Sequence, residues 1–288
     1  MIEDSYKLET RWQELTFVAA QKLATATKSA LTPSPSRTSK MAGKTLVILG
    51  SGPGIGIAVA KVFSVRGFTH VALVSRNKER LAQDEDSVLD AIQERGYSCR
   101  VKTWVCDIAD LKQLNATLKE IESFGSLECV LFNPARVAGK PALEESNEAI
   151  EADFRVCSRD FEMVEVLSTD NLQLTNIGLH ETAKWAIPLL KQAPEDSLPS
   201  LLVTSTTQLY KEPIPQLASL SMVKSAQRSL VLSLNALHGK DVHIALLSVG
   251  GIVSPDKKNL SPENIAEQAY NLYRQPRGSW EREMEIHE

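Results

Sequence analysis

Short apolar runs alternate with longer amphipathic stretches from residue 44 to residue 273. A short apolar run bounded by turn residues predicts a buried strand. Apolar positions that recur every three or four residues predict a helix that packs one face on a core. The predicted strands are 45–49, 71–74, 100–105, 129–132, 201–204 and 243–249. The predicted helices are 55–66, 78–95, 111–123, 179–191, 222–237 and 262–273.

The predicted strands are almost wholly apolar, which is typical of a parallel sheet that helices cover on both faces. We therefore expect a single α/β domain over residues 43–288, with three layers (αβα) built on a doubly wound parallel sheet. Residues 1–42 are expected to form a disordered leader and linker, because residues 32–40 consist mainly of Ser, Thr, Pro and Lys. Met41 is a natural domain start, so an extension of the gene model is the alternative for this segment.

Composition narrows the class of protein. Hydrophobic residues make up 43% and charged residues 24% of the 288 residues, as in ordinary globular proteins. A net charge of −4 argues against a general nucleic-acid binder, and no apolar run reaches the ~18 residues of a membrane helix. The four cysteines form no CxxC pair, which favours a reducing, cytoplasmic location, and the histidines show no zinc-ligand spacing.

Charge is unevenly distributed along the chain. Residues 15–78 contain nine Lys and Arg and no Asp or Glu. Such a positive region favours an anionic ligand. The alternative is a basic leader followed by two uncharged buried strands.

Four glycines occur in the seven residues from Gly50 to Gly56, between the first predicted strand and the first predicted helix. Glycines permit a tight turn there, and they let backbone N–H groups approach a pyrophosphate at the helix N-terminus. A simple turn would not need so many. We therefore expect Gly50, Ser51, Gly54 and Ile55 to contact a nucleotide.

The spacing Gly-x-x-x-Gly-x-Gly resembles that of the short-chain dehydrogenase/reductase family, whose members have a Rossmann fold. Residues 106–108, 132–136 and 250–253 resemble later landmarks of the same family, although Pro134 and Arg136 depart from its Asn-Asn-Ala-Gly pattern. The resemblance implies contacts with the adenine and with the nicotinamide end of the cofactor. The residues that it places there are Asp107, Ile108, Asn133, Ala135 and Val253.

In this family, the end of the second strand selects the nicotinamide cofactor. An acid at that position would bind the ribose 2′-hydroxyl of NAD, whereas an arginine accommodates the 2′-phosphate of NADP. This chain has Ser75, Arg76 and Asn77 at the corresponding place. We therefore predict NADP(H) as the cofactor; the alternative is a surface arginine that opens a helix.

The family's catalytic group is a Ser, a Tyr and a Lys. The Tyr donates a proton to the carbonyl, the Lys lowers the Tyr pKa and holds the ribose, and the Ser orients the carbonyl. Lys224 stands at the Lys position, whereas Leu220, which cannot donate a proton, stands at the Tyr position. Ser205 or Thr206 matches the Ser, and Asn176 is the nearest match to the family's catalytic asparagine.

Three hypotheses follow from Leu220. Another acid could replace the tyrosine; the candidates are Tyr210 and Arg136, although Tyr210 also fits a packed loop aromatic. Alternatively, NADPH could reduce an activated substrate such as an iminium ion, which needs a hydride but no proton. The third hypothesis is a nucleotide-binding protein without redox activity, or a reductase-derived cyclase.

One segment interrupts a run typical of a divergent fungal branch of the family, which commonly lacks the Tyr. Removing residues 156–173 joins Arg155 to Leu174 and restores Asp-Phe-Arg-Leu-Thr-Asn-Ile-Gly-Leu. We expect residues 156–173 to be a translated intron or, alternatively, a lineage-specific loop. The branch implies a small secondary-metabolite substrate, and the family implies a homodimer or homotetramer.

Overall fold

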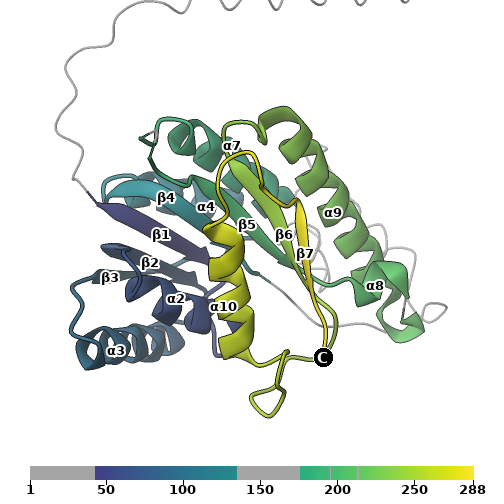
Figure 1. The fold of residues 1–288 in the computed structure, drawn as a ribbon, viewed down its shortest axis with the longest axis horizontal. Helices are drawn as coiled ribbons and strands as arrows, with labels where there is room; N and C mark the ends of the chain where they lie inside the picture. Colours follow the sequence, from purple (N-terminus) through teal and green to yellow (C-terminus); the bar gives the residue numbers. More distant parts are fainter. Residues whose placement is uncertain (1–42, 135–175, 195, 213) are drawn as a thin grey trace, which may run out of the picture. The chain divides into compact units, whose positions relative to one another are not determined.

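The computed structural model describes residues 43–134, 176–194, 196–212 and 214–288, which belong to one compact unit, Met41–Glu288. Their strands form a seven-stranded sheet in which every neighbouring pair is parallel (Figure 1). In chain order the strands are β1 (Lys44–Leu49), β2 (His70–Ser75), β3 (Arg100–Val105), β4 (Ser126–Phe132), β5 (Ser200–Ser205), β6 (His243–Val249) and β7 (Glu283–Ile286).

The strand order is β3-β2-β1-β4-β5-β6-β7, so the chain winds outward from β1 in two directions. Leu49 of β1 pairs with Val74 of β2 on one side and with Phe132 of β4 on the other. These three strands therefore end at the same level. Open α/β sheets bind their ligands at such a reversal of strand order, beyond the carboxyl ends of the strands.

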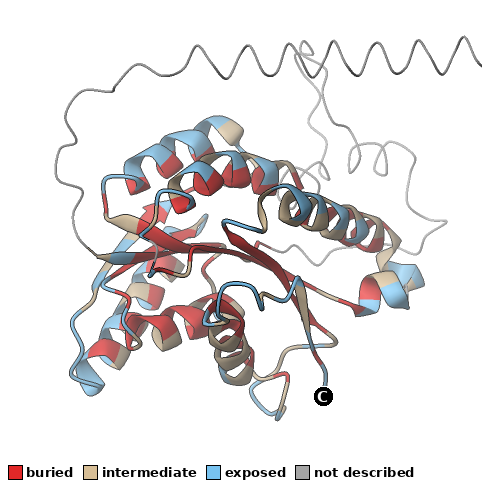
Figure 2. Cartoon of the chain, turned by 45° about the horizontal axis from the view of Figure 1, so that its top comes forward, coloured by how far each residue is buried: buried red, intermediate tan, exposed pale blue. Residues whose placement is uncertain are grey.

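Helices cover both faces of the sheet. They are α2 (Ile55–Ser64), α3 (Lys78–Glu94), α4 (Leu111–Ile121), α7 (Gly178–Leu190), α8 (Gln208–Lys211), α9 (Ala218–His238), α10 (Pro262–Tyr273) and the short 3₁₀ helix η3 (Pro215–Leu217). One buried core joins α2, α3 and α10 to the sheet, and a second core joins α4, α7 and α9 to the opposite face. Figure 2 shows the buried strands between helices whose outer surfaces are exposed.

The helices that flank the site begin in two ways. Asn77, Asp110 and Ser261 cap α3, α4 and α10, because their side chains accept backbone N–H bonds from the first turn. By contrast, α2 follows Gly54 and has no side-chain cap. The beginning of α2 therefore keeps backbone N–H groups available for another acceptor.

The fold class predicted from the sequence is confirmed: a parallel sheet lies between two layers of helices. Several details differ from the prediction: β4 begins at Ser126 rather than at residue 129, α2 ends at Ser64, and α8 and η3 are not predicted. Helix α9 begins at Ala218 rather than at residue 222, because its first turn buries hydroxyl residues that break the apolar pattern. The pattern also does not predict β7, since Glu283 and Glu285 alternate with apolar residues on this edge strand. The predicted leader 1–42 and the predicted insertion 156–173 lie outside the described residues.

Among the described parts of the chain, no helix is both long enough and apolar enough to cross a membrane.

Candidate functional site

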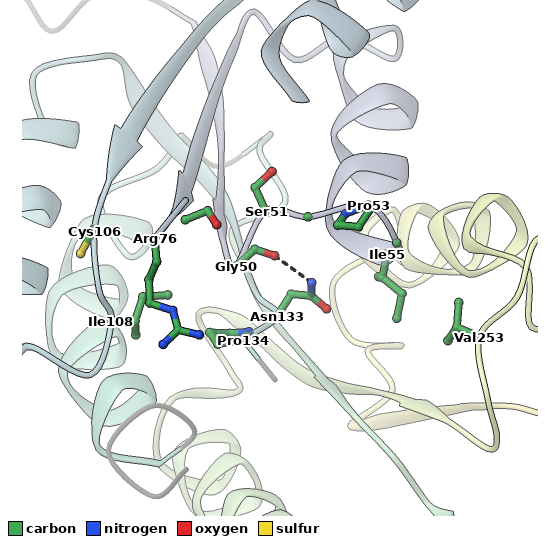
Figure 3. Close-up of a pocket in the computed structure, with 13 residues that line it drawn as sticks. Gly50, Ser51, Pro53, Ile55, Arg76, Cys106, Ile108, Asn133, Pro134 and Val253 are labelled. Carbon is green, nitrogen blue, oxygen red and sulfur yellow. Dashed lines mark hydrogen bonds between the residues drawn. The ribbon is translucent and has the colours of Figure 1, made fainter. Parts of the chain in front are cut away.

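A cavity of about 360 Å³ lies where β1, β2 and β4 end (Figure 3). The described residues that line it are Gly50, Ser51, Gly52, Pro53, Gly54, Ile55, Ser75, Arg76, Cys106, Ile108, Asn133, Pro134 and Val253. Most of them are predicted cofactor contacts. Sequence reasoning missed Gly52, Pro53, Cys106 and Pro134 as contacts, although each lies inside a motif that it singled out.

The glycines of the turn fall into two pairs. Gly50 has φ +92°, and a Cβ there would lie 2.8 Å from the carbonyl carbon of Asn133. A Cβ on Gly56 would lie 2.8 Å from the Gly50 carbonyl oxygen. Beside Gly52 and Gly54, however, a Cβ would meet no atom within 4 Å. The first pair is required by the packing of the turn itself, and the second pair leaves open space of the kind that a bound diphosphate would need.

The N-terminus of α2 faces this open space. Within the described ranges, the backbone N–H groups of Ile55 and Gly56 donate to no protein acceptor. The helix dipole adds a partial positive charge at the same end. This arrangement suits an anion, and it fits the phosphates of a dinucleotide.

Ser51 lines the pocket but directs its hydroxyl elsewhere. Its Oγ donates to Oδ2 of Asp84 at 2.7 Å, and in Figure 3 it points away from Asn133. Its backbone N–H and that of Gly50 both donate to the Val74 carbonyl at 2.9 Å. The Ser51 side chain therefore holds the turn to α3.

Asn133 links three strands at the centre of the site. Its backbone N–H donates to the Leu49 carbonyl at 2.8 Å. Its Nδ2 donates to the Gly50 carbonyl at 2.9 Å (Figure 3), and its Oδ1 accepts from Thr204 Oγ1 at 2.8 Å. One amide thus fixes the glycine turn after β1 relative to the end of β5. The sequence predicts Asn133 as a contact but gives no sign that Thr204 is its partner.

The end of β2 forms one wall of the pocket, which the resemblance assigns to the ribose and which we call the ribose wall. Ser75 and Arg76 line it, and Arg76 is exposed, with no ion pair to another described residue. Asn77 is predicted beside them, but it does not line the cavity. Its Oδ1 instead accepts the backbone N–H of Arg80 at 2.8 Å and caps α3.

The wall at β3 places one of its two predicted residues in the pocket. Ile108 lines the cavity together with Cys106. Asp107 lies between them in sequence but does not line it; its carboxylate accepts the Ala109 N–H at 3.1 Å. The predicted contact Ala135 and the candidate acid Arg136 lie outside the described residues.

Lys224 is buried in α9 and is 5% exposed. Its ammonium donates to Oε1 of Gln227 at 3.0 Å and to the Thr204 carbonyl at 3.5 Å. Burial lowers the pKa of Lys224 to about 8. Because Thr204 also bonds Asn133, this amine is connected to the cofactor pocket through two hydrogen bonds. Gln227 carries no family signal, so its contact appears only in the structure.

The predicted polar residues around Lys224 include two atoms that lack partners. Asn176 donates its Nδ2 to the Val223 carbonyl at 3.1 Å, which places it against α9. Its Oδ1 and the Ser205 Oγ are buried, and neither has a partner within the described ranges. Thr206 is partly exposed just beyond β5. Buried polar atoms without partners are costly, and they suit a site that a substrate or water completes.

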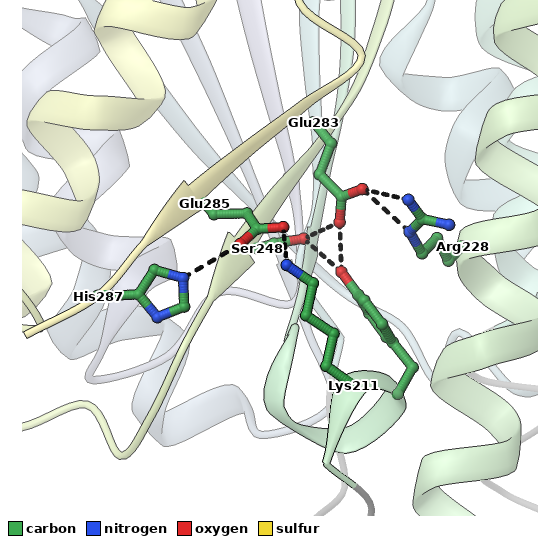
Figure 4. A network of polar contacts seen from close by, with 7 residues as sticks. Lys211, Arg228, Ser248, Glu283, Glu285 and His287 are labelled. Atoms are coloured by element: carbon green, nitrogen blue, oxygen red, sulfur yellow. Dashed lines mark hydrogen bonds and ion pairs between the residues drawn. The ribbon is translucent and has the colours of Figure 1, made fainter.

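Leu220 is 4% exposed and presents no ionisable group. The candidate replacement, Tyr210, donates its hydroxyl to Glu283 of β7 and lies 3.1 Å from Ser248 Oγ. Burial, together with the Glu283 bond, raises the pKa of Tyr210 to about 12. Figure 4 shows Glu283 between Ser248 and Arg228, which lies one helical turn beyond Lys224. The Tyr210 hydroxyl therefore bonds at the edge of the sheet, and within the described ranges no hydrogen bond joins it to Lys224.

In the described portion of the chain, no group of three or more His, Cys, Asp or Glu side chains is arranged to hold a metal ion.

Part of the chain matches a known protein family. Residues 44–160 match the family model for short chain dehydrogenase. Short-chain dehydrogenase/reductase 3 of Homo sapiens is 25% identical over 117 residues, which cover 40% of this chain and 37% of that protein. The chain spans less than half the length of the curated relatives that it matches first.

Solved structures share the fold. A short-chain dehydrogenase from Rhodopseudomonas palustris has a TM-score of 0.64 and 22% identity, over 85% of this chain and 98% of that chain. An alcohol dehydrogenase from the archaeon Thermococcus sibiricus, complexed with 5-hydroxy-NADP, has a TM-score of 0.65 and 21% identity, over 84% of this chain and 95% of that chain.

Proposed function

We propose that the protein is an NADP(H)-dependent oxidoreductase, because residues 44–160 match the family model for short chain dehydrogenase. Its substrate is the carbonyl or iminium group of a small organic molecule. One observation carries the cofactor assignment: the uncapped start of α2 faces open space at Gly52 and Gly54, and Arg76 lines the same pocket. The structural neighbour from Thermococcus sibiricus, whose complex holds 5-hydroxy-NADP, supports it.

The pocket residues divide the cofactor among them. The turn from Gly50 to Ile55 binds the diphosphate, and Ser75 with Arg76 binds the 2′-phosphate. Ile108 packs on the adenine, with Asp107 and Asn77 as further proposed contacts. At the opposite end, the proposed contacts are Asn133, Ala135, Val253 and Lys224. When bound, NADPH supplies the hydride of the reaction.

The protein must then handle the substrate without a tyrosine. Ser205 or Thr206 orients the reacting group, and Asn176 presents its unpartnered Oδ1 beside α9. The commitment of Tyr210 to Glu283 leaves it unsuited to give up a proton. An iminium substrate fits this site best, because its carbon accepts a hydride without any protonation step.

A second function is favoured by Leu220 itself. If no proton donor and no substrate nitrogen cation are present, the same pocket binds the nucleotide without redox chemistry. The protein is then a nucleotide-binding relative of the dehydrogenases or a cyclase derived from a reductase. Consumption of bound NADPH with a panel of cyclic iminium ions separates the two functions.

The finer features of the assignment are proposals as well. We place the protein in a divergent fungal branch, with a secondary-metabolite substrate, in the cytoplasm, as a homodimer or homotetramer. Residues 156–173 are proposed to be a translated intron; the family match ends at residue 160, inside this segment, which supports the idea. A spliced transcript that retains these codons would refute it and leave a genuine loop.

A fluorescence titration of the 288-residue chain with NADPH and with NADH tests the central proposal. We expect saturable binding of NADPH that is at least tenfold tighter than that of NADH, since only NADPH offers a 2′-phosphate to Arg76. Equal affinity for both would remove the role of Arg76, and binding of neither would refute the cofactor assignment.

A further inference from the structure

A buried carboxylate lies directly behind the glycine turn, and the proposed reaction does not use it. Asp84 of α3 is 1% exposed. Its Oδ2 accepts the Ser51 hydroxyl at 2.7 Å, and its Oδ1 accepts Nε of Arg80 at 2.9 Å. Ser51 lines the cavity, so a single hydroxyl group separates this carboxylate from the ligand space.

This position has an electrostatic consequence. A carboxylate removed from water needs a paired positive charge, because desolvation penalises its ionised form. Its field also reaches the pocket with little screening, since the space between them is protein and not solvent. An unpaired negative charge there would repel the anionic ligand that the α2 N-terminus attracts.

Arg80 supplies the pairing charge within the same helix. It stands four residues before Asp84, and its side chain is 37% exposed, so the guanidinium lies at the boundary between α3 and solvent. Its backbone N–H donates to Asn77 Oδ1, which fixes the first turn of α3 directly after Arg76. Arg80 is thus joined to the phosphate turn through Asp84 and Ser51, and to the ribose wall through Asn77.

We propose that Arg80 and Asp84 set the affinity of this pocket for anionic ligands. Asp84 anchors Ser51 and so holds the glycine turn in its binding shape, while Arg80 cancels the charge that this anchor introduces. Both are positioning residues, because they act through Ser51 and do not line the cavity. The inference rests on the proposed function insofar as the anion is the phosphate of a nucleotide.

The test distinguishes an effect of charge on anion affinity from an effect on the shape of the glycine turn. The variants are Arg80→Ala, Asp84→Asn, the double variant Arg80→Ala/Asp84→Asn, and Arg80→Lys. Arg66→Ala is the matched control: it removes the same charge just beyond the other end of α2, where Arg66 pairs with Glu267 at 2.8 Å. Each protein is titrated with NADPH, with ADP, and with uncharged adenosine, at low and at high salt.

We expect Arg80→Ala to weaken NADPH and ADP about tenfold at low salt, because the buried carboxylate then faces the ligand phosphates unopposed. The deficit shrinks at high salt, and adenosine affinity stays unchanged. In the double variant, affinity for both anions returns to within about threefold of the wild type, since the asparagine still accepts the Ser51 hydroxyl without a charge. Arg80→Lys keeps the charge and stays close to the wild type, as does Arg66→Ala.

Three outcomes would overturn the inference. Unchanged anion affinity in Arg80→Ala would show that the carboxylate does not influence the pocket. Equal losses in Arg80→Ala and the double variant would show that Arg80 acts through shape. A parallel loss of adenosine affinity would also indicate a purely structural role. Thermal unfolding of each variant identifies any that fails to fold, and Arg80→Lys then provides the comparison with the wild type.

Titration with both ADP and NADPH also distinguishes a failure of this inference from a failure of the proposed function. A wild type that binds ADP but not NADPH would refute the dinucleotide assignment, while the Arg80 variants would still be judged on ADP. A wild type that binds neither anion would refute both. Selective binding of NADPH together with an unaffected Arg80→Ala variant would leave the function standing and overturn only the role of Arg80 and Asp84.

Discussion

The cofactor side and the catalytic side of the site occupy adjacent strands of one sheet but depart from the family to different degrees. On the cofactor side, the turn after β1, the end of β2 and Asn133 converge on a single cavity. On the catalytic side, Lys224 is buried and bonded to Gln227, whereas Leu220, which the sequence resemblance aligns with the proton donor, presents no ionisable group. The family's cofactor chemistry is therefore matched more completely than its acid chemistry.

The polar groups of the two sides also differ in whether they have hydrogen-bond partners within the protein. On the cofactor side, the donors of the α2 N-terminus remain open, as an anion site requires. On the catalytic side, the Tyr210 hydroxyl and the Glu283 carboxylate satisfy each other, so they stabilise the edge of the sheet. The difference indicates that binding and chemistry can be separated by mutation in this protein.

The largest difference between an effect on folding and an effect on ligand binding is expected within the glycine turn after β1. We expect Gly50→Ala to destabilise the fold by about 3 kcal/mol, because φ +92° and a Cβ 2.8 Å from the backbone of Asn133 both oppose a side chain. Gly52→Ala should leave unfolding unchanged and weaken NADPH binding, since its Cβ enters open space. Thermal unfolding and NADPH titration of the pair test this. A stable Gly50→Ala protein would remove the distinction between packing glycines and ligand glycines.

Arg76 gives the next largest expected effect. Arg76→Ala should cost about 2 kcal/mol of NADPH affinity and leave NADH affinity unchanged, because only a 2′-phosphate makes a charge-assisted bond with the guanidinium. The ratio of the two dissociation constants is the measurement. Lys61→Ala, a substitution of a basic residue in the last turn of α2, is the control and should leave the ratio unchanged. Equal losses for both cofactors would assign Arg76 to the diphosphate.

The cofactor side could be predicted because its signals are local. The glycine turn, the end of β2 and the segment after β3 are each contiguous in sequence, and the alternation of strands and helices places them at one edge of the sheet. Even there, the bond from Ser51 to Asp84 joins residues 33 positions apart. Position 84 falls on the same face of α3 as Leu81 and Val88, but an acidic residue among other acidic residues carries no sign that it is buried.

The catalytic side could be predicted only in part, because its contacts join residues that are far apart in the sequence. Lys224 follows from motif spacing, but the role of Tyr210 depends on Glu283, 73 residues later on a strand that no apolar run reveals. Long-range polar contacts at an edge strand leave no periodic signal. The sequence therefore leaves the hypotheses for Leu220 open, and the contact of Tyr210 with Glu283 appears only in the structure.

Lys224 allows a test of whether a buried charge at this site lowers the stability of the ligand-free protein. Its pKa is lowered from 10.5 to about 8, so the unfolded chain binds more protons between these values and stability rises with pH across that window. Below pH 8 the buried charge costs about 3 kcal/mol. Loss of the bonds to Gln227 and Thr204 offsets part of this, so Lys224→Met should stabilise the ligand-free protein by about 1–2 kcal/mol at pH 7.

Chemical unfolding at pH 7 and pH 10 measures the Lys224 effect, and the gain should disappear at the higher pH. Lys184→Met, which removes an exposed lysine paired with Glu181, is the matched control and should change stability by less than about 0.5 kcal/mol at either pH. A destabilised Lys224→Met protein at pH 7 would mean that Lys224 contributes to folding and is not kept at a cost for binding or chemistry.

Tyr210→Phe gives the smallest expected effect and bears most directly on the comparison. Ser248 and Arg228 still bond Glu283 after the change, so the carboxylate keeps its partners and the loss should be about 1 kcal/mol of unfolding free energy. NADPH affinity and the rate of NADPH consumption with an iminium ion should not change. If consumption with a carbonyl compound, whose reduction needs a proton, falls a hundredfold while NADPH affinity holds, Tyr210 is the missing acid. The catalytic side would then match the family's chemistry as fully as the cofactor side does, with the proton supplied from the edge of the sheet instead of from α9.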